Sequence, residues 1–273
     1  MLTLLATPIG NLGDMSPRMR EALEQATLLA CEDTRRTGQL LQRLGIKPPK
    51  LVSYHKDNEA ARTAELVPLM VKGQSVTLIS DSGLPAISDP GARLVAAARA
   101  AGVSVGVIPG PSAVAMAVAG SGLEGPFLFH GFLPRKAGER KSLLARLAGY
   151  PETLVFYESP NRVAGTVAEL AGALGNRFAV LARELTKLHE EWLAAPLEEL
   201  AETLVNRDIK GECVLVVAGN SGEGERAEVA DAAIVARLAA VGHAKEVAAW
   251  LAAETGISKR EAYQRVLALQ PRK

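Results

Sequence analysis

Cysteine, histidine and aromatic residues are scarce in this chain, and it has no long hydrophobic run. The 273 residues include two cysteines, four histidines and 4% Phe, Trp and Tyr. Cys31 and Cys213 lie in apolar segments, so we interpret them as buried, reduced thiols of a cytoplasmic protein. No close spacing of His, Cys, Asp and Glu suits a metal ion, so no metal is expected. No apolar run approaches the roughly 20 residues that cross a bilayer, so no membrane partner is expected either.

Two common nucleotide-binding motifs are also missing. The sequence has no GxxxxGK[ST] phosphate loop and no GxGxxG at its first strand-to-helix turn, which argues against a P-loop enzyme and a classical dinucleotide site. The net charge is only +1, so the molecule as a whole does not attract nucleic acid. Between Arg135 and Arg146, however, five basic residues face one acidic residue. This patch either holds phosphates or forms an ordinary solvated helix face.

Strand-like and helix-like segments alternate over the first 120 residues. The expected strands cover residues 2–6, 27–31, 51–54, 76–79 and 103–108. Ser16-Pro17 and Asp89-Pro90 each have the residue types that cap and begin a helix. This alternation predicts βαβ units and a largely parallel sheet.

The second half of the chain reads as a further mixture of strands and helices. Strands are expected at residues 127–132, 154–158, 178–184 and 212–218, with helices begun by Pro160 and Pro196. Glycines cluster at residues 120–125, which marks a boundary. The fold class is therefore α/β, with two α/β domains and a small helical extension. The three parts are predicted at residues 1–121, 122–222 and 223–273.

The tail differs in character from the rest of the chain. A turn-rich linker is expected at residues 219–224, and the apolar spacing of residues 229–269 predicts helices throughout. Thr255-Gly256-Ile257, followed by a Ser258-capped helix, resembles a helix-turn-helix. The charge of this segment is nearly balanced, so it serves either as a packing or dimerisation element or as a nucleic-acid reader.

Three strand-like segments of the first half end in loops rich in Gly and Pro, at residues 7–11, 80–91 and 109–112. In open α/β sheets, small ligands bind at the carboxyl ends of the strands. Each loop alone could be a simple turn, but three together predict one composite pocket. Its short side chains and the carboxylate of Asp81 suit a neutral or cationic ligand with hydroxyl groups, such as an adenosyl group.

Long motifs along the chain resemble those of the tetrapyrrole-methylase-like methyltransferases. These motifs are ATPIGNLGDMSPR (6–18), CEDTRRTGQLL (31–41), SYHKDNE (53–59), LISDSGLPAISDPG (78–91), VIPGPSA (107–113), HGFLPRK (130–136), FYESPNR (156–162), ARELTKLHEE (182–191) and GECVLVVAG (211–219). The resemblance implies an enzyme that uses S-adenosylmethionine in a cleft between two α/β domains. Within this superfamily the chain is most similar to the bacterial small-subunit ribosomal RNA methyltransferases. That similarity implies methylation of a cytidine ribose 2′-hydroxyl in 16S ribosomal RNA, without a metal, by a homodimer.

The resemblance also implies which residues contact the cofactor. The matching positions are Pro8, Ile79, Ser80, Asp81, Leu84, Ser112, Ala113, Glu158 and Ala195. Pro8 lies on the first loop, and residues 79–84 correspond to the segment around the amino-acid part of the cofactor. At Ala195 the family usually has glycine near the adenine, so this chain departs from the pattern there.

Methyl transfer from a sulfonium to a hydroxyl is an in-line displacement, which requires alignment and removal of the hydroxyl proton. The candidates for the second task are Glu32, Asp33, His55 and Lys187, with Glu59 and Glu184 as further carboxylates near strand ends. Glu32 and Asp33 could instead cap the helix that follows them. His55 could equally be a packing residue.

Substrate contacts are expected from basic and aromatic side chains. Arg35, Arg36, Lys56, Arg135 and Lys136 are the candidates for phosphate contacts. Tyr54, Phe132 and Tyr157 are the aromatic residues best placed to stack on splayed bases. The first hypothesis is an RNA ribose methyltransferase. The alternatives are a methyltransferase for a tetrapyrrole or another small molecule, and a non-catalytic RNA- or ribosome-binding module.

Overall fold

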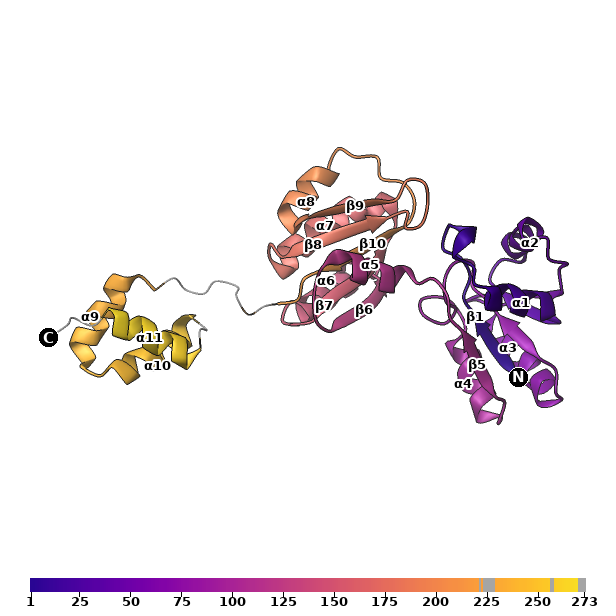
Figure 1. Ribbon diagram of the computed structural model, residues 1–273, viewed down its shortest axis with the longest axis horizontal. Helices are drawn as coiled ribbons and strands as arrows, with labels where there is room; N and C mark the ends of the chain where they lie inside the picture. The colour runs from indigo at the N-terminus through magenta and orange to yellow at the C-terminus, as the bar shows by residue number, and fades with distance from the viewer. Residues whose placement is uncertain (221, 223–228, 256–257, 270–273) are drawn as a thin grey trace.

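The computed structural model describes residues 1–220, 222, 229–255 and 258–269 (Figure 1). The expected linker at 219–224 and the turn at 255–257 therefore lie partly outside the described residues. None of the helices in these ranges is both long and apolar enough to span a membrane. The described chain forms two α/β units, each with its own sheet, and a group of three helices near the C-terminus.

The first unit has a five-stranded sheet of order β3-β2-β4-β1-β5. Every pairing in this sheet is parallel, which confirms the expected sheet type. The strands are β1 (Leu2–Leu5), β2 (Leu28–Cys31), β3 (Lys50–Ser53), β4 (Val76–Leu78) and β5 (Val105–Ile108). The helices are η1 (Leu12–Asp14, a 3₁₀ turn), α1 (Pro17–Gln25), α2 (Thr34–Arg43), α3 (Glu59–Val71) and α4 (Ala92–Ala100).

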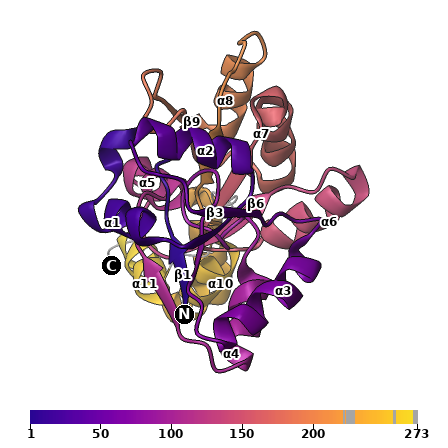
Figure 2. The ribbon, with the colours of Figure 1, turned by 90° about the vertical axis from the view of Figure 1, so that its right-hand side faces the viewer.

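Helices cover both faces of this sheet, because successive strand residues point to opposite sides. Leu4 packs with α3 and α4, whereas its neighbour Leu5 packs with α1 and α2. In Figure 2, α1 and α3 accordingly lie on opposite sides of β1. As expected, Ser16 caps α1 by accepting a hydrogen bond from the Met19 amide at 3.2 Å. The expected cap at Asp89-Pro90 is wrong, because α4 follows Gly91 and no side chain caps it.

The second unit has a mixed five-stranded sheet of order β6-β7-β10-β8-β9. Only the β6–β7 pair is parallel, and the other three pairs are antiparallel. The strands are β6 (Phe127–Phe132), β7 (Thr153–Glu158), β8 (Phe178–Arg183), β9 (Glu191–Pro196) and β10 (Cys213–Val217). The helices are α5 (Ala113–Ser121), α6 (Ala137–Leu147), α7 (Pro160–Leu174) and α8 (Leu197–Leu204). Helices α6, α7 and α8 pack on one face, around residues such as Phe156, Leu170 and Leu215.

Helix α5 covers the other face of the second sheet, where it contacts β8 and β10. Val114 and Ala117 of α5 pack there with Val214 and Val216 of β10. Ile9, on the loop after β1, is buried in the same group of apolar residues. A side chain of the first unit is thus part of the core of the second, and this contact places the two units side by side.

The C-terminal helices are α9 (Asp231–Val241), α10 (Ala244–Thr255) and α11 (Lys259–Ala268). They enclose a small core of their own, with Ile234, Leu251 and Val266 fully buried. The Arg237 guanidinium lies 4.4 Å from the centre of the Trp250 ring, within cation–π distance. The predicted helical extension is therefore present.

Glycine at position 91 allows the loop after β4 to turn into α4. Its φ is 143°, and an added Cβ would lie 2.8 Å from Leu78 Cδ2. We expect Gly91→Ala to lower the free energy of unfolding by about 1–3 kcal/mol, through backbone strain and overpacking. Urea unfolding measures this change. The control is Gly138→Ala near the start of α6, where nothing lies within 4 Å of an added Cβ; equal losses in both variants would contradict the explanation.

Candidate active site

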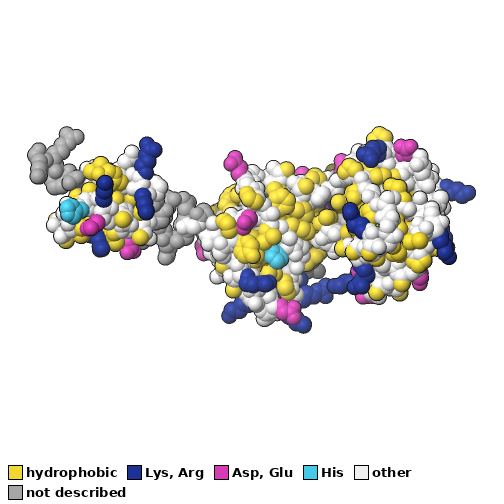
Figure 3. All heavy atoms as spheres, turned by 90° about the horizontal axis from the view of Figure 1, so that it is seen from below, with side chains coloured by type: hydrophobic (Ala, Val, Ile, Leu, Met, Phe, Trp, Pro, Cys, Tyr) yellow, Lys and Arg dark blue, Asp and Glu magenta, His cyan; other side chains and the backbone are white. Residues whose placement is uncertain are grey.

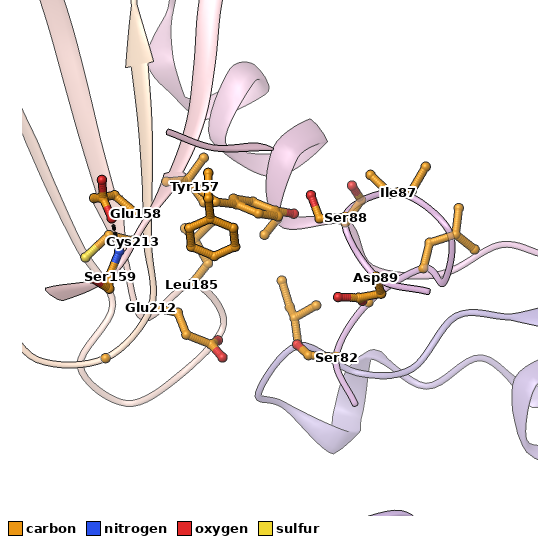
Figure 4. A pocket seen from close by; sticks show the side chains of 18 of the residues that line it. Ser82, Ile87, Ser88, Asp89, Tyr157, Glu158, Ser159, Leu185, Glu212 and Cys213 are labelled. Carbon is orange, nitrogen blue, oxygen red and sulfur yellow. Dashed lines mark hydrogen bonds between the residues drawn. The ribbon is translucent and has the colours of Figure 1, made fainter. Parts of the chain in front are cut away.

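A cavity of about 320 Å³ opens between the two α/β units at the strand ends (Figure 4). We call it the main cavity. The first unit contributes residues 9, 82–84 and 87–89, Ser112 and Ala113 at the start of α5 follow, and the rest of the second unit contributes 132, 157–160, 185 and 211–214. All three loops expected to form a composite pocket supply residues to this lining. Two backbone hydrogen bonds between Thr7 and Gly83, of 2.9 and 3.1 Å, hold the first two loops together.

A second cavity of about 250 Å³ adjoins the first. We call it the side cavity. The two cavities share Ile9, Ser82 and Glu212, of which only Glu212 is ionisable. The side cavity is also lined by Arg36 at the start of α2 and by Lys187 of the second unit. A ligand in the main cavity would therefore meet one in the side cavity beside the Glu212 carboxylate.

Carboxylates dominate the charge of the main cavity. Asp89 and Glu212 line it from opposite units, and Figure 4 shows both carboxylates at the opening between the units. Burial and the charges of Asp81 and Glu212 raise the pKa of Asp89. Burial, Asp89 and Glu212 also raise the pKa of Tyr157 to about 12. Burial is the larger cause of both shifts, but the charges of the carboxylates add to it, and these charges favour a cationic ligand.

Glu158 at the end of β7 is a buried carboxylate whose partners come from its own unit. Only 2% of the residue is exposed. It accepts hydrogen bonds from the Ser159 amide at 2.8 Å and from the Thr166 hydroxyl at 2.7 Å. Arg162 lies 3.4 Å from the same carboxylate. These contacts fix Glu158 at the wall of the main cavity, and Figure 4 draws the bond to the Ser159 amide as a dashed line.

The nine residues expected to contact a cofactor fall into three groups. Leu84, Ser112, Ala113 and Glu158 line the main cavity. Pro8, Ser80 and Asp81 line the side cavity. Ile79 and Ala195 line neither: Ile79 is buried in the first core, and Ala195 pairs with Ala179 in the second sheet.

Asp81 joins the loop after β4 to the start of α2. It accepts a hydrogen bond from the Asp33 amide at 3.2 Å and another from the Arg36 side chain at 3.3 Å. Asp33 in turn caps α2, since its side chain accepts from the Arg35 and Arg36 amides. Hydrogen bonds from the Arg35 side chain and amide lower the pKa of Asp33 to about 2. Of the two interpretations of Asp33, the structure supports the helix cap, and so low a pKa suits a proton acceptor poorly.

Glu32, the neighbour of Asp33, lies in a different environment. Burial and the charges of Asp89 and Asp81 raise its pKa, and Arg36 and His55 partly oppose this. No hydrogen bond or ion pair joins its carboxylate to any residue in the described ranges. Glu32 therefore has a raised pKa and an unengaged carboxylate among the described residues, but it lines neither cavity.

His55 and Lys187 are placed differently from each other. His55 is partly exposed after β3, 3.9 Å from the Asp57 carboxylate. Lys187 binds Glu184 at 2.7 Å and Glu212 at 3.1 Å. Partial burial opposes its charge, but these two carboxylates raise the pKa of Lys187. Lys187 thus stays protonated and cannot accept a proton, whereas it can position Glu212.

The residues expected to bind phosphate lie around the cavities. Arg35 and Arg36 are exposed at the start of α2, and Arg36 lines the side cavity. Arg135 and Lys136 are exposed in the turn after Phe132, which lines the main cavity. Lys56 is exposed after β3 and lines neither cavity. Figure 3 shows Lys and Arg side chains on both sides of the hollow between the two units.

Among the ionisable residues of the main cavity, sequence reasoning missed Glu212 and Cys213, and it included Asp89 only as part of the 80–91 loop. Glu212 and Cys213 lie at the start of β10, whereas the rule for parallel strands predicts ligand contacts at the carboxyl ends of strands. Because β10 is antiparallel to β7 and β8, its start lies beside their carboxyl ends. Burial raises the pKa of Cys213 to about 11, so its thiol stays protonated. Among the described residues, no three His, Cys, Asp or Glu side chains are grouped to hold a metal ion.

Comparison with known proteins places the chain in a family. The family model described as Tetrapyrrole (Corrin/Porphyrin) Methylases matches residues 1–201. The chain therefore belongs to the tetrapyrrole methylase family. It is 42% identical, over 99% of its length and 98% of the relative, to the ribosomal RNA small subunit methyltransferase I of Synechocystis. It is 46% identical to the protein of that name from Micromonospora olivasterospora, over 87% of this chain and 75% of the relative.

A solved structure shares the fold at lower sequence similarity. The uroporphyrin-III C-methyl transferase of Thermus thermophilus, complexed with S-adenyl homocysteine, matches 80% of this chain and 96% of its own. The TM-score is 0.55 and the identity 20%. This likeness shows the fold: two α/β units with helical covers.

The charge on Asp89 opposes folding, and this has a measurable consequence. A carboxyl whose pKa is raised on folding binds its proton more tightly in the folded state. The wild type therefore loses stability as pH rises from about 4, the ordinary range of Asp, through the raised pKa. We expect Asp89→Asn to unfold at higher urea concentration than wild type at pH 7, with a smaller difference at pH 4. Asp57→Asn, at a side chain that is 94% exposed, is the control. An Asp89→Asn protein that is no more stable at pH 7 would contradict this assignment.

Proposed function

We propose that this chain is an S-adenosylmethionine-dependent methyltransferase acting on a cytidine ribose 2′-hydroxyl of 16S ribosomal RNA. The names of its full-length relatives support the RNA substrate. The observation that carries the proposal is the pair of adjoining cavities, one acidic and one bordered by arginine, which meet at Glu212. Two reactants, a cationic methyl donor and an anionic RNA, need such a pair.

The residues of the main cavity fit S-adenosylmethionine. Its volume of about 320 Å³ lies within the range of small-molecule sites. Short side chains at Ser82, Ser112 and Ala113 leave the backbone accessible, and Leu185 and Val214 offer apolar surface to an aromatic ring. The carboxylates attract a ligand that carries sulfonium and ammonium charges. The Thermus protein of the same fold, complexed with S-adenyl homocysteine, supports this choice.

S-adenosylmethionine supplies an activated methyl group, and the protein must hold the acceptor hydroxyl in line with it and remove the hydroxyl proton. We propose that Glu212 takes this proton, because its carboxylate belongs to both cavities. Lys187 holds Oε2 of Glu212 at 3.1 Å, and no hydrogen bond to Oε1 is found among the described residues. Glu32 is the alternative acceptor. When Glu212 is the acceptor, Lys187 acts as a positioning residue that orients the Glu212 carboxylate.

The acceptor role predicts a specific loss of rate. Glu212→Gln keeps the shape of the side chain but cannot take a proton. We expect single-turnover methyl transfer to slow by about 10²- to 10⁴-fold, the usual contribution of a general base. Cofactor affinity, measured by calorimetry, should fall much less. A normal rate for Glu212→Gln together with a large loss for Glu32→Gln would move the role to Glu32.

The RNA is proposed to cross both cavities on the basic side chains around them. Arg35 and Arg36 would contact phosphates at the side cavity, and Arg135 and Lys136 at the main cavity. Lys56, exposed after β3, is proposed to contact a phosphate outside the two cavities. We also propose that the chain forms a homodimer, and the RNA contacts above do not depend on it. Sedimentation equilibrium measures the oligomeric state.

Methyl transfer to purified small ribosomal subunits tests the proposed function. Labelled S-adenosylmethionine should transfer its methyl group to 16S RNA, and resistance of the labelled linkage to alkaline cleavage identifies the ribose 2′-oxygen. Transfer to free tetrapyrrole instead would support the small-molecule alternative. Absence of S-adenosylmethionine binding at millimolar concentration would leave only a non-catalytic binding module.

The basic turn after β6 predicts a salt-dependent effect. We expect Arg135→Ala/Lys136→Ala to weaken RNA binding and to lower the slope of log affinity against log salt by about 2, one for each lost phosphate contact. Cofactor affinity should stay the same. The control, Lys72→Ala/Arg99→Ala, removes the same charge from exposed residues at the far ends of α3 and α4. Equal slopes for the two double variants would contradict the contact.

A further inference from the structure

Strand β6 contains an irregularity next to the main cavity. Phe129 pairs with Val155, but Gly131 rather than His130 pairs with the next residue of β7, Phe156. One extra residue of β6 is thus accommodated in a β-bulge, and Gly131 there has φ of 69°. Bulges near active sites commonly redirect a side chain. Here the shift decides which residue of β6 lies beside Tyr157.

Because of the bulge, Phe132 pairs with Tyr157. Side chains of paired strand residues point to the same face of a sheet. The two rings are indeed adjacent, with centroids 5.6 Å apart and planes at 58°. Without the extra residue Gly131 would take this place, and no ring would stand there. The bulge therefore adds Phe132 to the wall of the main cavity.

Phe132 buries little of its apolar surface in this position. It remains 59% exposed, although it touches Tyr157 and lines the cavity. Ile87 lines the cavity from the first unit and is 52% exposed. An aromatic ring and an aliphatic side chain, both exposed, thus border one opening from opposite units. Together with Tyr157 we call them the aromatic slot.

The surroundings of the slot indicate its ligand. Arg135 and Lys136 follow Phe132 by three and four residues and are exposed. A planar apolar surface followed within four residues by two exposed cations suits a nucleobase attached to a phosphate backbone. Single-stranded RNA is recognised by stacking splayed bases on aromatic side chains. Burial, Asp89 and Glu212 raise the pKa of Tyr157 to about 12, so its ring stays neutral and the stacking surface carries no charge of its own.

We propose that the slot formed by Phe132, Tyr157 and Ile87 is a stacking site for one unpaired base of the RNA substrate. This inference rests on the proposed function and adds a substrate-binding residue to it. Phe132 supplies the stacking face and Tyr157 supports it from behind. The adenine ring of the cofactor is the competing occupant, and the experiment distinguishes the two.

Binding of short oligocytidylates to the full chain tests the slot directly. The probe is a fluorescent oligocytidylate. It is compared with a series of oligocytidylates of equal length, each of which carries one abasic nucleotide at a different position. Both RNAs have the same phosphates, so their difference measures the base. We expect wild type to bind the intact RNA more tightly than the abasic RNA that lacks the stacked base. Phe132→Ala should lose this preference.

The expected size follows from other base-stacking aromatic residues. Phe132→Ala should weaken binding of the intact RNA by about 5- to 150-fold and leave the abasic RNA nearly unchanged. Phe132→Trp should restore the preference, whereas Phe132→Leu should not. The matched control is Phe127→Ala, at the opposite end of β6 and 46% exposed. It should behave as wild type.

The remaining measurements separate failure of the slot from failure of the proposed function. Calorimetric affinity for S-adenosylmethionine should not change in Phe132→Ala; a loss similar to that for RNA would assign the ring to adenine and overturn the slot. Equal effects of Phe127→Ala and Phe132→Ala would also overturn it. If wild type methylates small subunits but Phe132→Ala does so with unchanged KM, the slot alone fails. If wild type neither binds the cofactor nor methylates, the proposed function fails.

Discussion

The burial of Ile9 is the contact on which the arrangement of the site depends. Ile9 lies on the loop after β1 and packs with Val114, Leu185 and Val214, so the first loop of one unit is part of the core of the other. Apolar burial of this kind contributes roughly 1.5–3 kcal/mol per side chain. The parts of the two units that this contact brings together matter more than the free energy it contributes. It turns the carboxyl ends of β1 and β4 toward the start of β10, and the main cavity lies between them.

The same arrangement concentrates negative charge, which folding alone would disfavour. Asp89 and Glu212 come from different units, and their charges add to the effect of burial in raising the pKa of Tyr157. The repulsion between these carboxylates destabilises the empty site, and their attraction to a cation stabilises the filled site. A site for a sulfonium ligand therefore has unfavourable electrostatic energy when empty and favourable electrostatic energy when filled. This trade between stability and binding is typical of functional sites.

Much of the fold could be predicted from sequence, because most strands are buried apolar runs that end at Gly or Pro. The first sheet was predicted in type, and its strand ends agree within two residues. Strand β9 was missed, because its sequence EWLAAP has no clear alternation and ends in proline, which an edge strand tolerates. The loops of the main cavity were also predictable, since parallel strands place their carboxyl ends together. Glu212 was not, because its place at the cavity depends on an antiparallel pairing between distant segments.

Gly10 and Lys187 show why separate motifs belong together. The side chain of Lys187 crosses the first loop so closely that a Cβ at Gly10 would lie 2.4 Å from its Cγ. Its ammonium group then reaches Glu184 and Glu212. Glu184 and Thr186 have positive φ, of 52° and 68°, in the turn that carries Lys187. Strain at non-glycine residues persists where surrounding contacts fix it. Here those contacts join three motifs, so the glycine of the first loop and the strained turn both serve to place one cation beside the Glu212 carboxylate.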